Sequence, residues 1–88
     1  MTAHVWVTMK PTVLDPQGQA IQQALASLGY AQVTDVRQGK LFVLQLDGVS
    51  REEARQQVER IAREVLTNPV IEEFRFEILA ENTAVPSS

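Results

Sequence analysis

Cysteine is absent from this 88-residue sequence, and histidine occurs only once, as His4. Without cysteine the chain has no disulfide, no thiolate metal site and no cysteine nucleophile. A single histidine with neither a second histidine nor a cysteine does not complete a zinc site, so we interpret His4 as a solvated residue near the end of a strand. These absences exclude several common kinds of metal and catalytic site.

Long apolar runs and an excess of basic charge are missing as well. The longest apolar run is the segment 41–44, whereas a membrane-spanning helix needs about 20 apolar residues. Lys and Arg number 8 against 11 Asp and Glu, and the net charge of −3 argues against nucleic acid or an anionic membrane as a partner. With 44% hydrophobic residues, we expect one cytoplasmic globular domain over residues 1–79 and a flexible C-terminal tail over 80–88.

What the sequence does contain is a regular alternation of apolar and polar residues in four segments, which predicts four β-strands. These strands are expected over residues 4–9, 33–37, 41–46 and 70–79. The alternation slips within 33–37, which indicates a bulge. Gln38-Gly39 then predicts a two-residue hairpin turn between the second and third strands, because glycine tolerates the positive φ of such turns.

Two further segments carry apolar residues at helical spacing, and both have clear ends. Asp15, followed by a proline, predicts the start of one helix, and Gly29 predicts its end. Ser50 and Glu53 form a capping box at the start of the other, which Pro69 and the two residues before it terminate. The resulting order is β-α-β-β-α-β. It predicts an α+β, ferredoxin-like fold, with a four-stranded antiparallel sheet and two helices on one face.

One face of that sheet is left without helices, and it carries apolar residues. If Val7 and Phe42 face the helices, the alternation places Trp6, Leu41 and Val43 on the opposite face. A tryptophan with two aliphatic neighbours on one sheet face indicates a covered surface. We therefore predict that these three residues form an oligomer interface. The alternative is a monomer in which Trp6 folds over its neighbours.

No set of residues has the spacing of a known catalytic motif. There is no phosphate-binding glycine motif, and no serine has a basic partner at a recognisable spacing. Glu72 and Glu73 are adjacent on a strand, so their carboxylates point to opposite faces. Arg37 and Lys40 flank the expected turn and could meet an anion or an acidic partner, but their spacing alone favours a role in solubility. We predict no catalytic residue and no metal site in this chain.

Three strings in the chain, with the distances between them, resemble the PurS family. The strings are Leu14-Asp15-Pro16-Gln17-Gly18, Arg37-Gln38-Gly39-Lys40 and Asn68-Pro69-Val70-Ile71-Glu72. The resemblance extends over about residues 4–79 without a gap. PurS is the small subunit of phosphoribosylformylglycinamidine (FGAM) synthase, an enzyme of de novo purine biosynthesis.

The resemblance implies a subunit of a glutamine-dependent carbon-nitrogen ligase, with no activity of its own. In this family PurS is a non-catalytic auxiliary subunit that brings the glutaminase PurQ and the synthetase PurL together. Ammonia released from glutamine is then used in the ATP-dependent conversion of FGAR to FGAM. The resemblance further implies a homodimer or homotetramer. We expect no cofactor on this chain, with ATP and Mg on the PurL partner, and neither nucleic acid nor a membrane as a partner.

The loop before the first helix is the main candidate for a partner contact. Asp15 and the proline after it suffice to start a helix, so Gln17 and Gly18 are not needed for capping. Gly18 also permits a close backbone approach. Together with the resemblance, this predicts a partner-binding set formed by Asp15, Pro16, Gln17, Gly18, Arg37, Gly39 and Lys40.

Other protein classes share the same element order. An ACT-type regulatory module would bind an amino acid at the loop of residues 15–18, but it usually accompanies a catalytic domain, which this chain lacks. An acylphosphatase-like enzyme needs an arginine in the loop after the first strand, and residues 11–20 contain none. An RNA-recognition domain needs aromatic and basic residues on the open sheet face. The ACT-type module is the main alternative.

Overall fold

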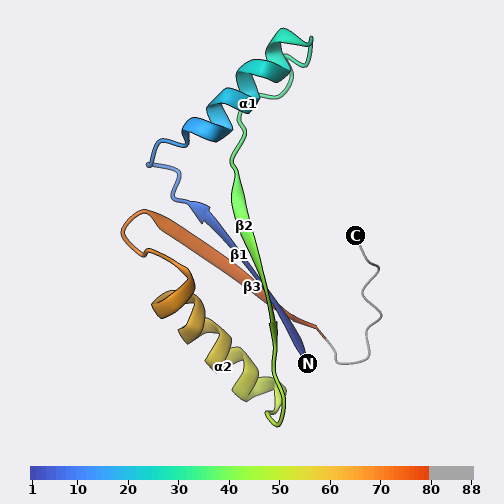
Figure 1. Cartoon of the computed structure of the whole chain (residues 1–88), viewed down its shortest axis with the longest axis vertical. Coiled ribbons are helices and arrows are strands. Elements are labelled where there is room, and N and C mark those ends of the chain that lie inside the picture. Colours follow the sequence, from blue (N-terminus) through green and yellow to red (C-terminus); the bar gives the residue numbers. More distant parts are fainter. Residues whose placement is uncertain (80–88) are drawn as a thin grey trace.

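The computed structural model describes residues 1–79, and the expected tail over 80–88 lies outside the described residues. Along the chain the elements are β1 (Thr2–Met9), α1 (Pro16–Ser27), β2 (Gly39–Gln45), α2 (Arg51–Ile61), a short π-helical segment η1 (Ala62–Leu66) and β3 (Glu72–Leu79) (Figure 1). The strands predicted over 4–9, 41–46 and 70–79 are confirmed as β1, β2 and β3, with ends that differ by a few residues. None of the helices in the described residues is long and apolar enough to cross a membrane.

The three strands form one antiparallel sheet in the order β2-β1-β3, with β1 in the centre. Val5 pairs with Phe42 on one side and with Phe76 on the other, so these three side chains point to the same face. The alternation along β1 thus places its side chains as the sequence predicts. Val5 and Val7 lie on one face of the sheet, and Trp6 lies on the other.

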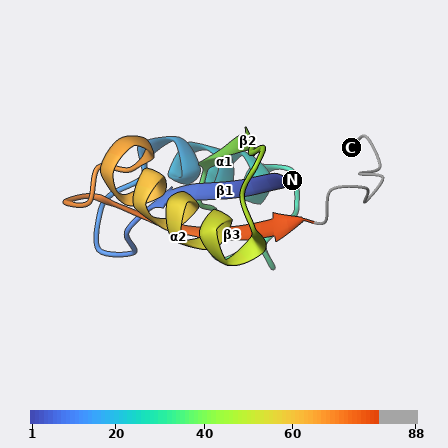
Figure 2. The same cartoon turned by 90° about the horizontal axis from the view of Figure 1, so that it is seen from below.

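Helix α2 covers the apolar face of the sheet and makes the core with it (Figure 2). The fully buried residues of this core are Ala3, Val5, Val7, Ala54, Val58 and Ala62. The capping box is confirmed: Ser50 Oγ accepts from the Glu53 amide at 3.1 Å, and Glu53 Oε1 accepts from the Ser50 amide at 3.1 Å. The hydrogen bond from the Ser50 amide to the carboxylate is the main reason why the pKa of Glu53 lies below its ordinary value. Arg51 donates to the carbonyl of Ile78 at 3.1 Å and ties the start of α2 to β3.

The strand predicted over residues 33–37 is not formed, and that prediction is wrong. This segment has no strand in the structure, and Gly39 already lies in β2, paired with Thr8, so residues 38–39 are not a hairpin turn. The physical reason is that no turn separates the segment from β2. Without a reversal it cannot pair with β2, and both edges of β1 are already occupied by β2 and β3. The described residues therefore contain three strands instead of four.

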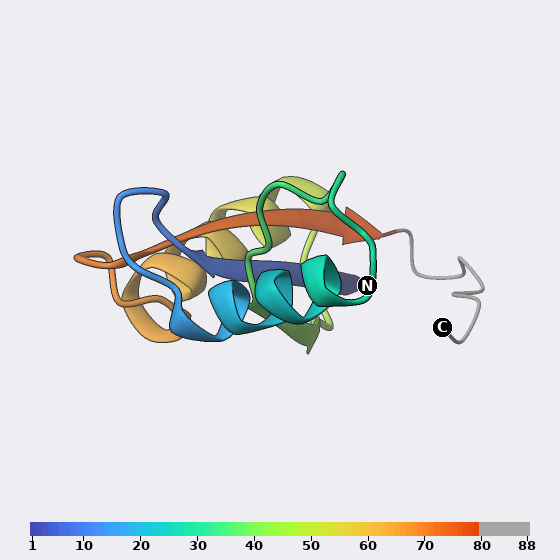
Figure 3. The same ribbon diagram turned by 90° about the horizontal axis from the view of Figure 1, so that it is seen from above.

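The first helix begins and ends where the sequence predicts, but it does not lie on the face of the sheet as predicted. Asp15 caps its start, and Gly29 follows its end with a φ of +97°. Yet α1 makes almost no contact with the sheet or with α2, and it lies beyond the end of the sheet instead of on its face (Figures 1 and 3). The expectation of two helices on one face is wrong for the single chain. We call residues 15–38, which comprise α1 and the extended segment that returns to β2, the arm.

Candidate functional site at the base of the arm

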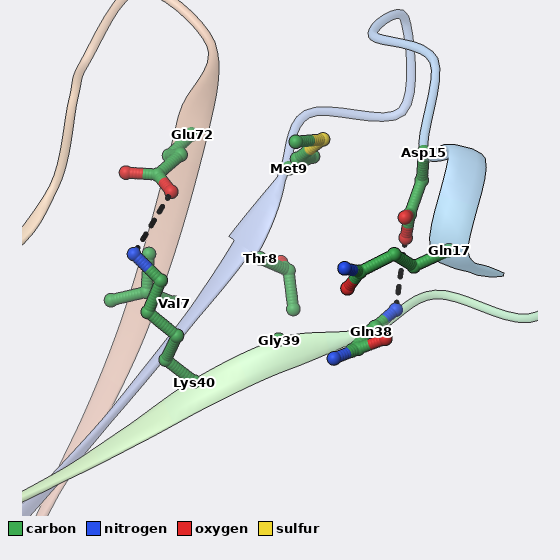
Figure 4. A pocket seen from close by; sticks show the side chains of 9 residues that line it. All are labelled: Val7, Thr8, Met9, Asp15, Gln17, Gln38, Gly39, Lys40 and Glu72. Atoms are coloured by element: carbon green, nitrogen blue, oxygen red, sulfur yellow. Dashed lines mark hydrogen bonds and ion pairs between the residues drawn. The ribbon is translucent and has the colours of Figure 1, made fainter.

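Four of the seven predicted partner-binding residues line one cavity where the arm leaves the sheet, and Pro16, Gly18 and Arg37 are not part of its lining. Asp15 and Gln17 arrive from the start of α1, and Gly39 and Lys40 arrive from the start of β2 (Figure 4). They line a cavity of about 130 Å³, which is completed by Val7, Thr8, Met9, Gln38 and Glu72. Two strings that are more than twenty residues apart in the sequence thus form one site.

The carboxylate of Asp15 joins the two ends of the arm. Its Oδ1 accepts from the amide of Gly18 at 3.0 Å, and its Oδ2 accepts from the amide of Gln38 at 2.9 Å. These two hydrogen bonds are the main reason why the pKa of Asp15 lies below its ordinary value; burial opposes this shift, and the charge of Arg37 supports it. Asp15 is only 7% exposed. Asp15 therefore does more than cap the helix, because it also binds the amide of Gln38, the residue directly before β2.

Gly18 is buried at the same place, and the close backbone approach that it permits is to the returning segment of its own chain, while the partner contact stays a prediction. A Cβ atom at this position would lie 2.1 Å from the carbonyl oxygen of Val36 and 2.8 Å from Asp15 Oδ2. The first turn of α1 consequently lies directly against the returning segment. Further along the arm, Gln22 Nε2 donates to the carbonyl of Thr34 at 2.7 Å. The arm is thus a folded unit of one helix and one extended segment.

Arg37 is turned toward its own chain. Its Nη1 donates to the carbonyl of Val13 at 2.9 Å, its Nη2 donates to the carbonyl of Pro11 at 3.0 Å, and its Nε lies 3.6 Å from a carboxylate oxygen of Asp35. It therefore fastens the loop between β1 and α1 to the returning segment. The prediction that Arg37 flanks a hairpin turn is wrong, because this turn is not formed.

Gly39 and Lys40 lie at the start of β2. A Cβ on Gly39 would come within 2.5 Å of the carbonyl oxygen of Val7, so the pairing of β2 with β1 at this position requires glycine. Lys40 Nζ lies 3.9 Å from Glu72 Oε2, and Glu72 Oε1 accepts from the Asn68 amide at 2.8 Å. The sequence reasoning did not assign Glu72 or Gln38 to the site. Glu72 lies within a string that marked the family resemblance, whereas Gln38 acts through its backbone and leaves no signal in the sequence.

The chemistry of the site suits contacts better than a reaction. Figure 4 shows the amide groups of Gln17 and Gln38 at the cavity, where they offer neutral donors and acceptors, and the Lys40 ammonium beside Glu72. Within residues 1–79 no group of three or more His, Cys, Asp or Glu side chains is placed to hold a metal ion. Gln17 and Lys40 have exposed side chains, so they can reach another molecule.

The open face of the sheet carries the residues predicted there. Trp6 pairs with Leu41 and His4 pairs with Val43, and all four point away from α2. Leu41 is 52% exposed and Val43 is 55% exposed, while the guanidinium of Arg75 lies 4.2 Å from the centre of the Trp6 ring. His4 contacts Trp6 edge to face and is half-buried, so it is less solvated than the sequence indicates.

The fold is that of a small α+β domain. At its site, Asp15 holds the start of α1 and the start of β2 together, and Gln17 and Lys40 have side chains that are exposed to another molecule. A family model described as "PurS: Phosphoribosylformylglycinamidine (FGAM) synthase" matches residues 2–80. The chain therefore belongs to the PurS family.

Individual proteins agree with this assignment. The phosphoribosylformylglycinamidine synthase subunit PurS of Synechocystis sp. is 43% identical over 82 residues, which are 93% of this chain and 82% of that protein. The structure of PurS from Bacillus subtilis is 41% identical and superposes with a TM-score of 0.73, over 86% of this chain and 94% of that one. A chain in the structure of PurLQS from Thermotoga maritima is 29% identical and has a TM-score of 0.79, over 89% of this chain and 95% of that one.

Proposed function

We propose that this chain is the auxiliary PurS subunit of FGAM synthase in purine biosynthesis. It assembles the glutaminase PurQ with the synthetase PurL, so that ammonia from glutamine is used to convert FGAR to FGAM. The observation that carries this function is the family match over residues 2–80, together with the likeness to a chain of a PurLQS structure over 89% of this chain. The same match favours this function over an ACT-type module.

The chain takes part in the ligase reaction as a subunit and has no activity of its own. We place ATP and magnesium on the PurL partner and no cofactor on this chain, and we place the complex in the cytoplasm. The side chains around the arm base support a contact role, since the amides of Gln17 and Gln38 and the ion pair of Lys40 with Glu72 can bind a protein surface.

The contact with a partner subunit is proposed at the base of the arm. Gln17 and Lys40 supply the exposed side chains that touch the partner, while Asp15, Gly18 and Gly39 give this surface its shape through their backbone contacts. Arg37 contributes indirectly, because it fixes the adjacent loop. The open sheet face of Trp6, Leu41 and Val43 is proposed as an interface between copies of the chain.

Reconstitution with purified PurL and PurQ tests the function. FGAM formation is measured with glutamine and, separately, with an ammonium salt, in the presence and absence of this chain. We expect the glutamine-dependent rate to require the chain and the ammonium-dependent rate to change much less. A glutamine-dependent rate that is the same without the chain would contradict the proposed function.

A variant pair tests the site within the same assay. Gln17→Ala is expected to raise the amount of this subunit that is needed for half-maximal glutamine-dependent activity. Gln56→Ala, at an exposed position of α2 far along the chain from the site, is the matched control. If both variants titrate like the unaltered chain while that chain itself is required, the function stands and the partner contact lies elsewhere.

A further inference from the structure

A third group of exposed apolar side chains lies where the chain passes from η1 into β3, apart from the arm and from the open sheet face. Val65 is 74% exposed, Val70 is 75% exposed and Ile71 is 36% exposed. No charged residue occurs in the segment 65–71, although charged residues make up 22% of the chain. The described residues therefore leave an uncharged apolar surface at this end of the sheet (Figure 1).

Val65 reaches this surface because the helix changes its winding. Val58, Ala62 and Val65 follow one another at α-helical spacing, and the first two are fully buried in the core. From Ala62 on, the chain forms the π-helical η1, whose turns hold more residues than those of an α-helix. The wider turn brings Leu66 against the core in place of Val65. Val65 is thereby presented to the solvent.

The turn of residues 68–71 holds Val70 in a fixed position. Asn68 Oδ1 accepts from the Val70 amide at 3.1 Å. The Asn68 carbonyl accepts from the Ile71 amide at 3.1 Å and from the Glu72 amide at 2.8 Å. An apolar side chain on such an ordered turn loses little conformational entropy when it binds another molecule, so the turn is preorganised for a contact.

Glu72 connects this turn to the base of the arm. Its Oε1 accepts from the Asn68 amide at 2.8 Å, and its Oε2 lies 3.9 Å from Lys40 Nζ (Figure 4). The same residue lines the cavity at the arm base and a second cavity of about 280 Å³ beside the turn. The second cavity is further lined by Arg63, Thr67, Pro69, Glu73 and Phe74. The proposed partner contact at the arm base therefore borders the turn directly.

The arm base lacks the apolar part that a stable interface contains. Its exposed side chains, Gln17 and Lys40, are polar. Protein interfaces commonly combine an apolar centre with a polar rim, and they bury about 800 Å² on each partner. Val65 and Val70 lie on the adjoining surface and supply the apolar contacts that the arm base does not.

We propose that the turn of residues 68–71 is the apolar part of the contact with a partner subunit, and that Val70 enters an apolar pocket on the same subunit that touches Gln17 and Lys40. This inference rests on the proposed function. The occupant is that subunit because Lys40 and the turn are joined through Glu72, so a molecule that covers one borders the other. The pocket is uncharged, since residues 65–71 offer no charge to pair with one inside it.

Three variants in the reconstituted synthase test the inference. Val70→Glu places a charge at the centre of the contact, and we expect the amount of this subunit needed for half-maximal glutamine-dependent activity to rise by about 10-fold or more. Gln56→Glu introduces the same charge at an exposed position of α2 and is the matched control. Val70→Ile keeps the position apolar and is expected to titrate like the unaltered chain. Because Val70 is 75% exposed, the fold tolerates both changes, which circular dichroism checks.

Binding measurements with purified PurL and with purified PurQ identify the partner. We expect Val70→Glu to weaken binding of the same subunit that Gln17→Ala weakens, and a loss confined to the other subunit overturns the inference. If Val70→Glu titrates like Gln56→Glu while the unaltered chain is required, the inference fails and the proposed function stands. A glutamine-dependent rate that does not require the chain overturns both. Sedimentation of the chain alone is the last check: if Val70→Glu changes its self-association, the turn contacts a second copy and the inference is wrong.

Discussion

The two helices of this chain are almost equally long and chemically opposite. α2 has six charged residues among its 11, and it buries Ala54 and Val58 against the sheet. α1 has none among its 12, and the only residue that it buries is Gly18. Charges along the outer side of α2 suit a helix whose other side is covered by its own sheet. The lack of charge on α1 suits a helix that is covered on more than one side, which the single chain does not provide.

The largest effect that this comparison predicts is at the core of α2. Val58→Glu puts an unpaired charge among fully buried side chains and should cost about 3–5 kcal/mol of unfolding free energy. The same charge in α1, as Gln23→Glu at an exposed position, should change the unfolding free energy by no more than about 0.5 kcal/mol. Urea denaturation of both variants measures this difference, and similar losses in the two helices would contradict the contrast between them.

The next largest effect is expected where α1 does contact its chain. Gly18→Ala would bring a methyl group to 2.1 Å from the carbonyl oxygen of Val36, so the arm must shift, at about 1–3 kcal/mol. Gln19→Ala, at the next and exposed position, is the control and should be tolerated. Thermal unfolding followed by circular dichroism reports the difference. If Gly18→Ala unfolds at the same temperature as Gln19→Ala, the contact between α1 and Val36 is not a constraint.

Acidification should act on the starts of both helices, each through one carboxylate. The pKa of Asp15 is lowered from 3.8, and the pKa of Glu53 is lowered from 4.5, in both cases mainly by hydrogen bonds from backbone amides. Because the folded-state pKa lies below the unfolded value, each carboxylate stabilises the fold fully above the unfolded value. This contribution is lost as the pH falls through the folded-state pKa.

NMR titration of the two carboxyl groups measures their pKa values and so tests this prediction. The Gln38 amide shift should follow the titration of Asp15, and Asp15→Asn should remove this dependence, because the Gln38 amide donates to the Asp15 carboxylate. The Ser50 amide should follow Glu53 in the same way. A pKa of Asp15 at or above 3.8 would mean that the hydrogen bonds at the arm base are absent in solution.

The smallest effect is expected from the ion pair at the arm base. Lys40 Nζ and Glu72 Oε2 are 3.9 Å apart, and the lysine side chain is 64% exposed. Solvent screening keeps such a pair weak, so Lys40→Met should change the unfolding free energy by less than about 0.5 kcal/mol. The same variant should nevertheless weaken the proposed partner contact in the reconstituted synthase. A large loss of stability would show that Lys40 serves the fold more than the partner.

The parts of the fold that the sequence predicted correctly are those with local causes. The cap at Asp15, the capping box of Ser50 and Glu53, and the positive φ after α1 at Gly29 each involve groups within a few residues of one another. The alternation along β1 is local as well. It correctly places Trp6, Leu41 and Val43 on the face opposite α2, and whether they form an interface stays a prediction.

The candidate site was predicted as two separate strings, and it is one place in the structure. Nothing in the sequence indicates that the carboxylate of Asp15 reaches the amide of Gln38, because this hydrogen bond depends on how the arm folds back. Arg37 shows the same limit. Its charge indicated a surface role, whereas three acceptors of its own chain surround it.

The sequence by itself determined the ends of both helices, the three strands of the sheet, the apolar face of β1 and the family. Only the tertiary structure decided where α1 lies and whether residues 33–37 pair. That decision depends on the backbone at Gln38-Gly39, where a turn would have produced a four-stranded sheet in one chain and a straight path produces an arm. Glycine permits both conformations, and the choice is made by contacts of residues far apart in the chain, from Asp15 to Gln38 and from Thr8 to Gly39.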